Sequence, residues 1–244
     1  MIKNFKFIIS YDGTNLKGWQ FQPNVRTVQG DIEKKLSKLF KGQRINLIGS
    51  GRTDSGVHAL GQVANIFLDT TWSNDNIKNA LNANLENDIY IKTVDQIDDG
   101  FHARFSAINR SYKYFVRKDF CPFDRFFSWE TKNKIDLNIL DDCALLILNN
   151  QDFTNFCKAN AEVKSKKCKI IESNWQQKNE KFIFSIKANR FLHHMVRFLV
   201  GTMLEVSRGR IPLVEFENML KLKPTQYKVL CAPSRGLFLD KVIY

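Results

Sequence analysis

The spacing of hydrophobic positions in the first part of the chain predicts strands and helices in a definite order. Residues 5–12 form an apolar run rich in β-formers, which predicts a strand. Apolar residues then recur every three or four positions and place one hydrophobic stripe on a helix; they are Val28, Ile32, Leu36 and Leu39. The pattern predicts further strands at residues 45–48, 62–68 and 89–97 and a helix at residues 77–85. The order β-α-β-β-α-β is that of ferredoxin-like folds.

The remainder of the chain repeats this order. The pattern predicts strands at residues 112–117, 169–175, 182–188 and 237–244, and helices at residues 137–148, 192–206 and 214–220, the last being an extra short element. We therefore expect an α+β protein with two ferredoxin-like domains, residues 1–104 and 105–244, joined near residues 102–110. Their strands would form a mixed, mostly antiparallel sheet with helices packed on it and a central basic cleft.

Composition supports a folded chain and its charge points to a polyanion. Hydrophobic residues make up 43% of the 244 positions, which is typical of a globular protein and unlike a disordered one. The 37 Lys and Arg exceed the 25 Asp and Glu by 12 charges, which favours nucleic acid or an acidic membrane surface as partner. A Lys-rich chain without any such partner fits the charge equally well.

Five scattered cysteines form no CxxC pair, so neither a zinc site nor a disulfide framework is indicated. They are typical of reduced thiols in a cytoplasmic protein. No stretch approaches the roughly 18 continuous apolar residues of a membrane span, so we expect a cytoplasmic location and no membrane partner.

Residues 49–61 carry the densest chemistry in the chain. This segment, GSGRTDSGVHALG, contains four glycines with Arg52, Asp54 and His58 among them. Glycine allows close backbone approach, so such a loop can bring charged side chains against a ligand. A solvated turn in which Asp54 and Arg52 pair explains the same composition. Nucleotide hydrolysis is disfavoured because the phosphate-loop pattern GxxxxGK[ST] is absent and no GxGxxG opens a helix.

The segment GRTDSGVHALGQVANIF resembles the signature loop of the TruA family of tRNA pseudouridine synthases. Four other segments resemble that family in the same order: YDGTNLKGWQFQ, FHARFSAINRSYKYFV, FLHHMVRFLVGTMLEV and APSRGLFLDKVIY. The resemblance covers essentially the whole chain. It implies isomerisation of uridine at positions 38, 39 and 40 of the tRNA anticodon stem-loop, by a homodimer that uses neither metal nor cofactor.

The resemblance also implies roles for individual residues. Asp54 would be the catalytic residue, Arg197 its ion-pair partner, Arg52 the residue that helps displace the target base, and Tyr112 the aromatic that packs on that base. The motif alone selects Tyr112 over Tyr114. Further substrate contacts would come from His58, Arg104 and His193.

Each role agrees with elementary chemistry. A carboxylate can stabilise or trap positive charge at an anomeric carbon, or remove a neighbouring proton. Desolvation would raise the pKa of Asp54, so a cation such as Arg197 is needed nearby. On the predicted helix 192–206, His193, Arg197 and Gly201 share one side at four-residue spacing, and Gly201 leaves room for another backbone or for the substrate.

Other polar residues leave alternatives open. The four histidines lie in the resembling segments, and we expect RNA contacts or structural hydrogen bonds from them. A basic run would bind phosphate or form a solvated face; it comprises Lys158, Lys164, Lys166, Lys167 and Lys169. Arg104 and Arg110 flank the join and could equally be surface residues. A non-catalytic RNA-binding module is the main rival function, whereas a zinc deaminase is discounted because the chain lacks its HxE and paired-cysteine ligands.

Overall fold

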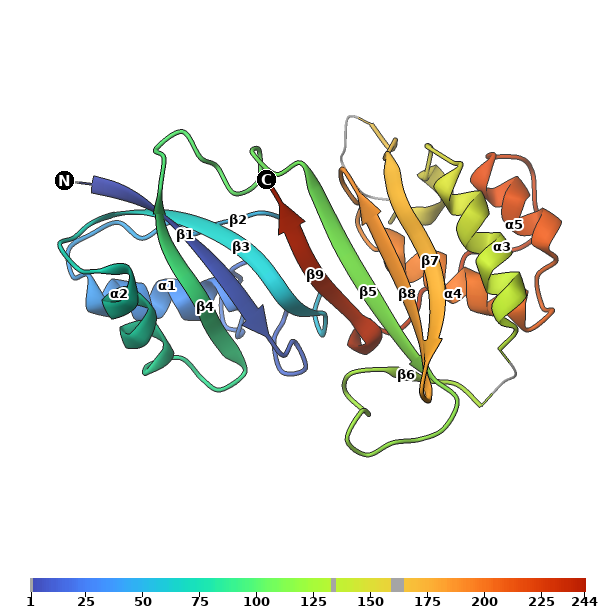
Figure 1. Ribbon diagram of the computed structural model, residues 1–244, viewed down its shortest axis with the longest axis horizontal. Coiled ribbons are helices and arrows are strands. Elements are labelled where there is room, and N and C mark those ends of the chain that lie inside the picture. The colour runs from blue at the N-terminus through green and yellow to red at the C-terminus, as the bar shows by residue number, and fades with distance from the viewer. Residues whose placement is uncertain (1, 133–134, 159–164) are drawn as a thin grey trace. The chain divides into compact units, whose positions relative to one another are not determined.

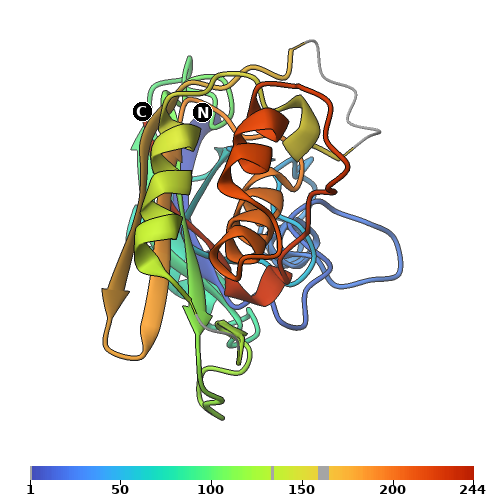
Figure 2. The ribbon, with the colours of Figure 1, turned by 90° about the vertical axis from the view of Figure 1, so that its right-hand side faces the viewer.

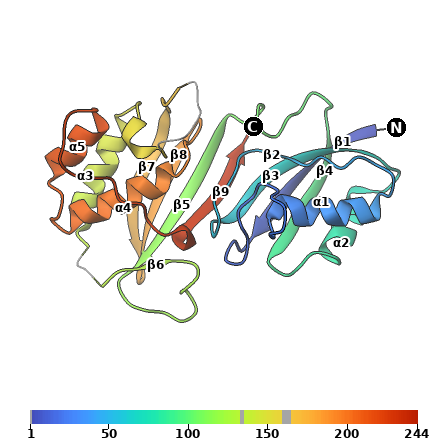
Figure 3. The same ribbon diagram turned by 180° about the vertical axis from the view of Figure 1, so that it is seen from behind.

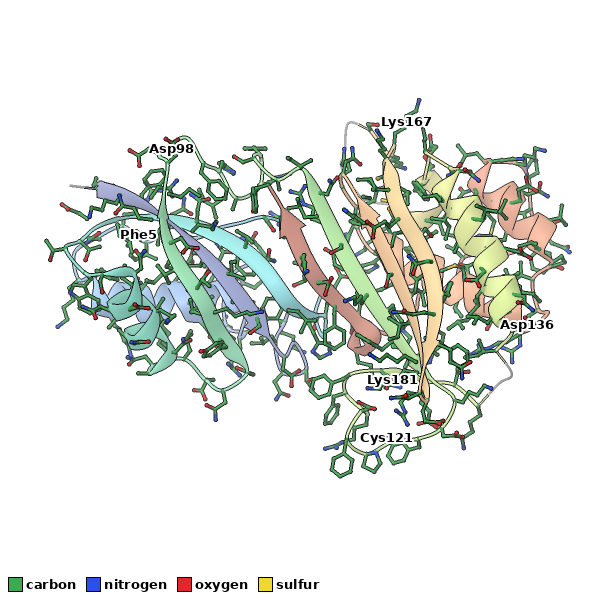
Figure 4. The ribbon with its side chains drawn as sticks, viewed as in Figure 1. Phe5, Asp98, Cys121, Asp136, Lys167 and Lys181 are labelled. Carbon is green, nitrogen blue, oxygen red and sulfur yellow. The ribbon has the colours of Figure 1, made fainter. Side chains whose placement is uncertain are left out.

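The computed structural model describes residues 2–132, 135–158 and 165–244 (Figure 1). The chain divides into two compact units. Unit 1 contains the chain up to residue 108 together with residues 238–244, and unit 2 contains residues 109–237. Figure 4 adds the side chains of each unit to the ribbon.

Unit 1 contains a sheet in which the strands lie in the order β4-β1-β3-β9, with the short β2 paired to β3. The strands are β1 (Ile2–Tyr11), β2 (Ile48–Gly49), β3 (His58–Asp69), β4 (Ile89–Ile97) and β9 (Leu237–Ile243). All pairs are antiparallel except β3 with β9, where His58 lies opposite Phe238. The last strand of the chain thus pairs with the first unit.

Two helices cover one face of this sheet (Figure 3). Helix α1 (Val28–Leu39) begins where the Thr27 side chain accepts from the Gly30 amide, and α2 (Asn74–Asn82) begins where Ser73 accepts from Asn76. These caps satisfy amides that the first helical turn leaves unpaired. Alternate residues of β1 are buried and form the core with the stripe of α1; they are Phe5, Phe7, Ile9, Ile32 and Leu36. Each such side chain stabilises the fold by about 1.5–3 kcal/mol.

Unit 2 contains strands in the order β5-β8-β7, with the short β6 parallel to β5. Their bounds are β5 (Asn109–Arg117), β6 (Trp129–Glu130), β7 (Ile170–Lys178) and β8 (Lys181–Ala188). Three helices gather on one face of β7 and β8 (Figure 2): α3 (Leu137–Leu148), α4 (Met195–Ser207) and α5 (Leu213–Leu220). The described part of the unit also contains two 3-10 turns, η1 (Thr154–Phe156) and η2 (Ser234–Gly236).

Aromatic and sulfur contacts hold the core of unit 2. The rings of Trp175 and Phe184, on neighbouring strands, lie 5.1 Å apart, and the indole N–H of Trp175 donates to Sδ of Met203 at 3.4 Å. Because Met203 lies on α4, this buried contact ties the helix to the sheet.

The fold class predicted from the sequence is confirmed: the described chain is α+β, its strands mixed and mostly antiparallel. Helices α1 and α3 and strand β4 have the predicted bounds or nearly so. The division into functional domains at residues 104 and 105 stays a prediction.

Several predicted elements differ from the structure in their bounds. Strands β1, β3 and β5 begin three or four residues earlier than expected, β7 ends three residues later, and α2 lies three residues nearer the N-terminus. For β2 and the start of α4 the structure shows the physical reason. Only Ile48 and Gly49 form β2, whereas residues 45–48 were expected, because the backbone of Leu47 bonds to side chains instead. Its amide donates to Glu33 Oε1 at 2.9 Å, and its carbonyl accepts from Gln29 Nε2 at 3.2 Å.

Helix α4 begins at Met195, three residues later than expected. His194 adopts the left-handed conformation with φ of 64°, which no helix interior accommodates. The apolar periodicity nevertheless continues through buried Leu192, which is why the pattern extended the helix too far.

None of the helices in the described ranges combines the length and hydrophobicity needed to cross a lipid bilayer.

Candidate active site

Asp54 lies in the loop of unit 1 that connects β2 to β3, and its side chain is half-buried. The residues on either side of it differ in exposure: Thr53 is buried and Arg52 is exposed. The loop therefore exposes the Arg52 guanidinium and part of the Asp54 carboxylate, while Thr53 between them is buried.

The buried side chain of Gln62 fixes the start of this loop. Its side chain is fully buried and accepts from Ser50 Oγ at 2.7 Å, while its amide donates to the carbonyl of Gly51 at 3.0 Å. The Ser50 amide also donates to the Val63 carbonyl at 2.8 Å. A buried amide side chain with its partners satisfied costs little and specifies one conformation.

The segment after β1 fixes the loop from the side. The amide of Trp19 donates to the Thr53 carbonyl at 3.1 Å, and the hydroxyl of Tyr11 lies 2.7 Å from Thr53 Oγ1. Gly18 has φ of 89°, and a Cβ at this position would lie 2.6 Å from the Thr53 carbonyl oxygen. Only glycine meets both requirements at Gly18. This close approach positions the backbone immediately before Asp54.

A chain of side-chain hydrogen bonds leads from Arg52 to helix α1. Arg52 Nε donates to Gln20 Oε1 at 3.0 Å, and Gln20 Nε2 donates to Gln29 Oε1 at 2.9 Å. Gln29 in turn donates to Glu33 at 3.0 Å. The exposed guanidinium is thus held by a partner whose own position is set by a helix.

His58, at the start of β3, is 1% exposed and its ring stacks on Phe238 at 4.5 Å. His58 Nδ1 lies 3.0 Å from the Gly13 amide nitrogen and 3.1 Å from Asp12 Oδ1, so both residues of the turn after β1 contact the same ring nitrogen. The structure uses His58 to join the loop to the turn after β1.

Arg104 lies in an exposed turn after β4. Its guanidinium carbon is 5.5 Å from the centre of the Phe105 ring. His102 accepts the amides of Arg104 and Phe105 on Nδ1, at 3.1 and 3.3 Å, so this histidine makes structural hydrogen bonds.

Tyr112 lies on β5 in unit 2, half-buried, with its ring edge-on to Phe191 at 4.9 Å. Tyr114, two residues on, is fully buried and donates its hydroxyl to the Pro233 carbonyl at 2.7 Å. Burial also raises the pKa of Tyr114 above its usual value. Of the two tyrosines, Tyr112 alone has exposed surface for a ligand.

Arg197 lies on α4, where a neighbouring segment holds its side chain and backbone. Arg197 Nε donates to the Ala232 carbonyl at 2.8 Å, and the Ala232 amide donates to the Arg197 carbonyl at 3.0 Å. A Cβ on Gly201 would lie 2.1 Å from the carbonyl oxygen of Leu230. The space beside Gly201 therefore takes another backbone, one of the two occupants that the sequence left open.

His193 is not on the helix with Arg197, contrary to the expectation from four-residue spacing, because α4 starts after His194. The rings of His193 and His194 meet edge-on, with their centres 4.3 Å apart. The left-handed backbone at His194 turns the rings toward each other.

Part of the basic run lies on an exposed edge of unit 2. Lys158, Lys167 and Lys169 are exposed and Lys166 is half-buried, whereas Lys164 lies outside the described residues. Figure 4 shows Lys167 at one end of the unit, in the segment before β7. Arg110, on β5, donates to the Asn189 carbonyl at 3.1 Å.

Sequence reasoning missed the residues that support the loop, namely Tyr11, Gln20, Gln29, Thr53 and Gln62. Their hydrogen bonds join segments distant in sequence, which no periodicity encodes. The resemblance was the available signal: Tyr11 and Gln20 lie in YDGTNLKGWQFQ, Thr53 and Gln62 lie in GRTDSGVHALGQVANIF, and Gln29 lies in neither segment.

Comparison with known proteins identifies the family. Residues 7–106 and 150–244 match the family model described as tRNA pseudouridine synthase. Three similar proteins are each named tRNA pseudouridine synthase A. The one from Geobacillus sp. (strain WCH70) is 39% identical over 100% of this chain and 99% of its own length. The one from Bacillus subtilis (strain 168) is 39% identical over 98% of each chain, and that from Thermoanaerobacter sp. (strain X514) 38% over 100% of each. The chain belongs to the tRNA pseudouridine synthase family and is an isomerase of uridine in tRNA.

Proposed function

We propose that this synthase modifies uridines 38, 39 and 40 of the tRNA anticodon stem-loop and that Asp54 is its catalytic carboxylate. The reaction breaks the bond from ribose C1′ to uracil N1 and forms one from C1′ to C5. The hydrogen on C5 leaves as a proton while N1 gains one, so the product is an isomer. A carboxylate serves by stabilising or trapping charge at C1′, or by removing a neighbouring proton.

One observation carries the proposal: the loop is held rigidly while its carboxylate keeps exposed surface. Thr53, next to Asp54, bonds through both its side chain and its carbonyl, and the Asp54 carbonyl accepts from the Val57 amide at 3.2 Å. A catalytic group that is already positioned loses little entropy when the substrate arrives.

Arg52 and Tyr112 suit the handling of the target base. A paired uridine must leave its stem, at a cost of a few kcal/mol that protein contacts offset. Arg52 is exposed and held by Gln20, which fits insertion in place of the base. Tyr112 keeps part of its ring exposed, which fits packing on the flipped base.

Arg197 is proposed as the ion-pair partner that keeps Asp54 ionised. Arg197 belongs to unit 2 and Asp54 to unit 1, so this pair rests on the family resemblance. The bond from Nε to Ala232 supports a fixed orientation of the guanidinium.

The remaining proposals concern RNA binding and assembly. Arg104, His193 and the basic run would contact RNA across a basic cleft, while His58, being buried, would position the Asp54 loop. We propose a cytoplasmic homodimer without metal or cofactor, as the resemblance implies.

Tritium release tests both the reaction and the residue. tRNA labelled at uridine C5 is treated with the wild type, with Asp54→Asn and with the matched control Asp99→Asn, an exposed aspartate on a turn. We expect release by the wild type and the control, none by Asp54→Asn, and unchanged tRNA affinity in all three. Mapping should place the product at positions 38 to 40. Release by Asp54→Asn would disprove the catalytic role, and tRNA binding without release by the wild type would favour a non-catalytic RNA-binding protein.

A further inference from the structure

The turn that follows β4 in unit 1 exposes one aromatic ring between a histidine and an arginine. Phe105 is 76% exposed, although burial of a ring of this size is normally favourable. The His102 ring lies 4.3 Å from it at an angle of 34°, and the Arg104 guanidinium lies 5.5 Å from its centre. Asp98, labelled in Figure 4, marks the start of this turn.

Local hydrogen bonds make the turn rigid. His102 Nδ1 accepts the amides of both Arg104 and Phe105, which fixes the plane of the imidazole. The His102 amide donates to Ser106 Oγ at 3.0 Å, and the Ser106 amide donates back to the His102 carbonyl at 2.9 Å. The ring of Phe105 therefore rests on a support that is already ordered.

Buried contacts fasten the turn to the sheet of unit 1. Ala103 is fully buried; its amide donates to Asn65 Oδ1 at 2.9 Å, and its carbonyl accepts the Tyr244 hydroxyl at 2.7 Å. Asn4 Nδ2 donates to the Phe101 carbonyl at 2.9 Å. Polar side chains with 0% exposure, Asn4 and Asn65, thus hold a segment whose neighbour is mostly in solvent.

This combination fits a nucleobase better than a protein side chain. A single exposed apolar residue is common and needs no partner. Here, however, the ring is rigid and an exposed cation lies beside it, which is how proteins bind unpaired nucleotides. The chain carries a net charge of +12 and belongs to a family that acts on tRNA. The available partner is therefore a polyanion with flat bases.

We propose that Phe105 stacks on an unpaired base of the bound tRNA while Arg104 contacts a neighbouring phosphate. Stacking does not depend on which base is present, so the contact orients the RNA without reading its sequence. The inference rests on the tRNA substrate of the family and is independent of the role of Asp54.

Binding of a full-length tRNA transcript to the intact protein tests the stacking. We expect Phe105→Ala to raise Kd roughly 10- to 100-fold, the range that loss of one stacked base gives. Phe105→Trp should bind like the wild type, and its fluorescence should be quenched by tRNA more than that of the wild type. The matched control is Phe120→Ala, which removes a ring that is 61% exposed in unit 2 and should leave Kd unchanged.

The salt dependence of Kd separates stacking from charge. Arg104→Ala should lower the slope of log K against log salt by about 0.7–0.9, as expected when the protein neutralises one phosphate fewer. Phe105→Ala should shift the whole line without changing its slope. Thermal unfolding of Phe105→Ala should match that of the wild type, because this side chain is 76% exposed.

Three results would overturn the inference. They are an unchanged tRNA affinity in Phe105→Ala, an equal loss of affinity in Phe120→Ala, and a loss of affinity in Phe105→Trp. Sedimentation provides one more outcome. If Phe105→Ala changes the oligomeric state and leaves tRNA affinity intact, the ring contacts a second copy of the chain instead. Tritium release by the wild type would persist in each case, so failure here leaves the proposed reaction standing.

Discussion

Tyr11 and Thr53 meet through a hydrogen bond of 2.7 Å between the phenol oxygen and Oγ1, and both side chains are buried. Tyr11 ends β1 and Thr53 immediately precedes Asp54. The bond therefore fixes the residue next to the candidate catalytic carboxylate relative to strand β1.

Tyr11→Phe tests this link. The change keeps the ring and removes the hydroxyl, so the hydrogen bond to Thr53 Oγ1 can no longer form. We expect the free energy of unfolding to fall by about 1–2 kcal/mol and turnover to fall while tRNA affinity is kept. Urea denaturation and tritium release measure the two effects. Tyr90→Phe, at a tyrosine that is 54% exposed, is the control and should change neither.

Gln20→Ala tests whether Arg52 must be held in place. The change removes the acceptor of Arg52 Nε, which lies 3.0 Å away. We expect kcat to fall several-fold because an unheld guanidinium is positioned less often for base displacement. The defect should shrink on a tRNA whose target uridine is mismatched, since that base needs less displacement.

The control for this variant is Gln22→Ala, two residues along the same segment, whose amide bonds to a backbone carbonyl at the surface. An equal loss on paired and mismatched targets would mean that Gln20 acts through folding and not through Arg52.

Gly201→Ala tests the close packing of helix α4. An added Cβ would lie 2.1 Å from the Leu230 carbonyl oxygen, so the backbone that holds Arg197 must move. We expect a loss of about 2 kcal/mol in the free energy of unfolding and reduced activity. Gly51→Ala, where an added Cβ meets nothing within 4 Å, should change stability by less than about 0.5 kcal/mol. Equal stability of the two variants would contradict the packing argument.

The spacing of apolar residues predicted best the helices α1 and α3, whose backbone amides and carbonyls bond to one another within the same helix. Helices α1 and α3 lie where three- and four-residue spacing put them, because their apolar stripes face a core and a side-chain cap marks each start. It failed at β2 and at the start of α4. There the decisive groups were the side chains of Glu33 and Gln29, and the left-handed backbone of His194.

The sequence predicted only those site residues that are charged and lie together in one motif. Asp54 and Arg52 stand out in a glycine-rich loop, so composition drew attention to them. Gln20 and Gln62 did not, because amide side chains carry no periodic signal and become meaningful only when distant segments meet. Gly201 shows the same limit: its need for space was evident, but its occupant required the structure.

Lys166→Ala with Lys167→Ala tests the basic run as a phosphate-binding segment. Both changes keep the backbone bonds of this segment, including the Phe153 amide to the Lys166 carbonyl at 3.2 Å. We expect the salt slope of tRNA affinity to decrease by about 0.7–0.9 for each phosphate that the variant no longer neutralises. The double variant of Lys38 and Lys41, two exposed lysines of unit 1, controls for net charge. An equal decrease of the salt slope in the control would mean that the basic run is a solvated face and does not bind phosphate.

Asp124 gives the protein a specific acid sensitivity in the loop between β5 and β6. Burial is the largest single effect on the pKa of this carboxyl, and it raises the pKa. The hydrogen bond and charge of Lys181, the charge of Arg117 and a hydrogen bond from Cys121 act in the opposite direction. Together they outweigh burial and lower the pKa below its ordinary value of 3.8. The carboxylate oxygens lie 2.8 Å from Lys181 Nζ and 2.9 Å from Arg117 Nη1. Figure 4 shows Cys121 and Lys181 at this end of unit 2.

Because the folded pKa is lowered, Asp124 contributes stability that is fully present above its unfolded pKa and is lost as pH falls through the folded value. Asp124→Asn should therefore be less stable than the wild type at pH 7. The difference should narrow below about pH 4, where the unfolded carboxyl protonates, and vanish at lower pH. Urea unfolding from pH 7 to pH 3 measures it, with exposed Glu180→Gln as the control. A difference that stays constant over this range would mean that the shape of the residue, and not its charge, holds Arg117 and Lys181 together.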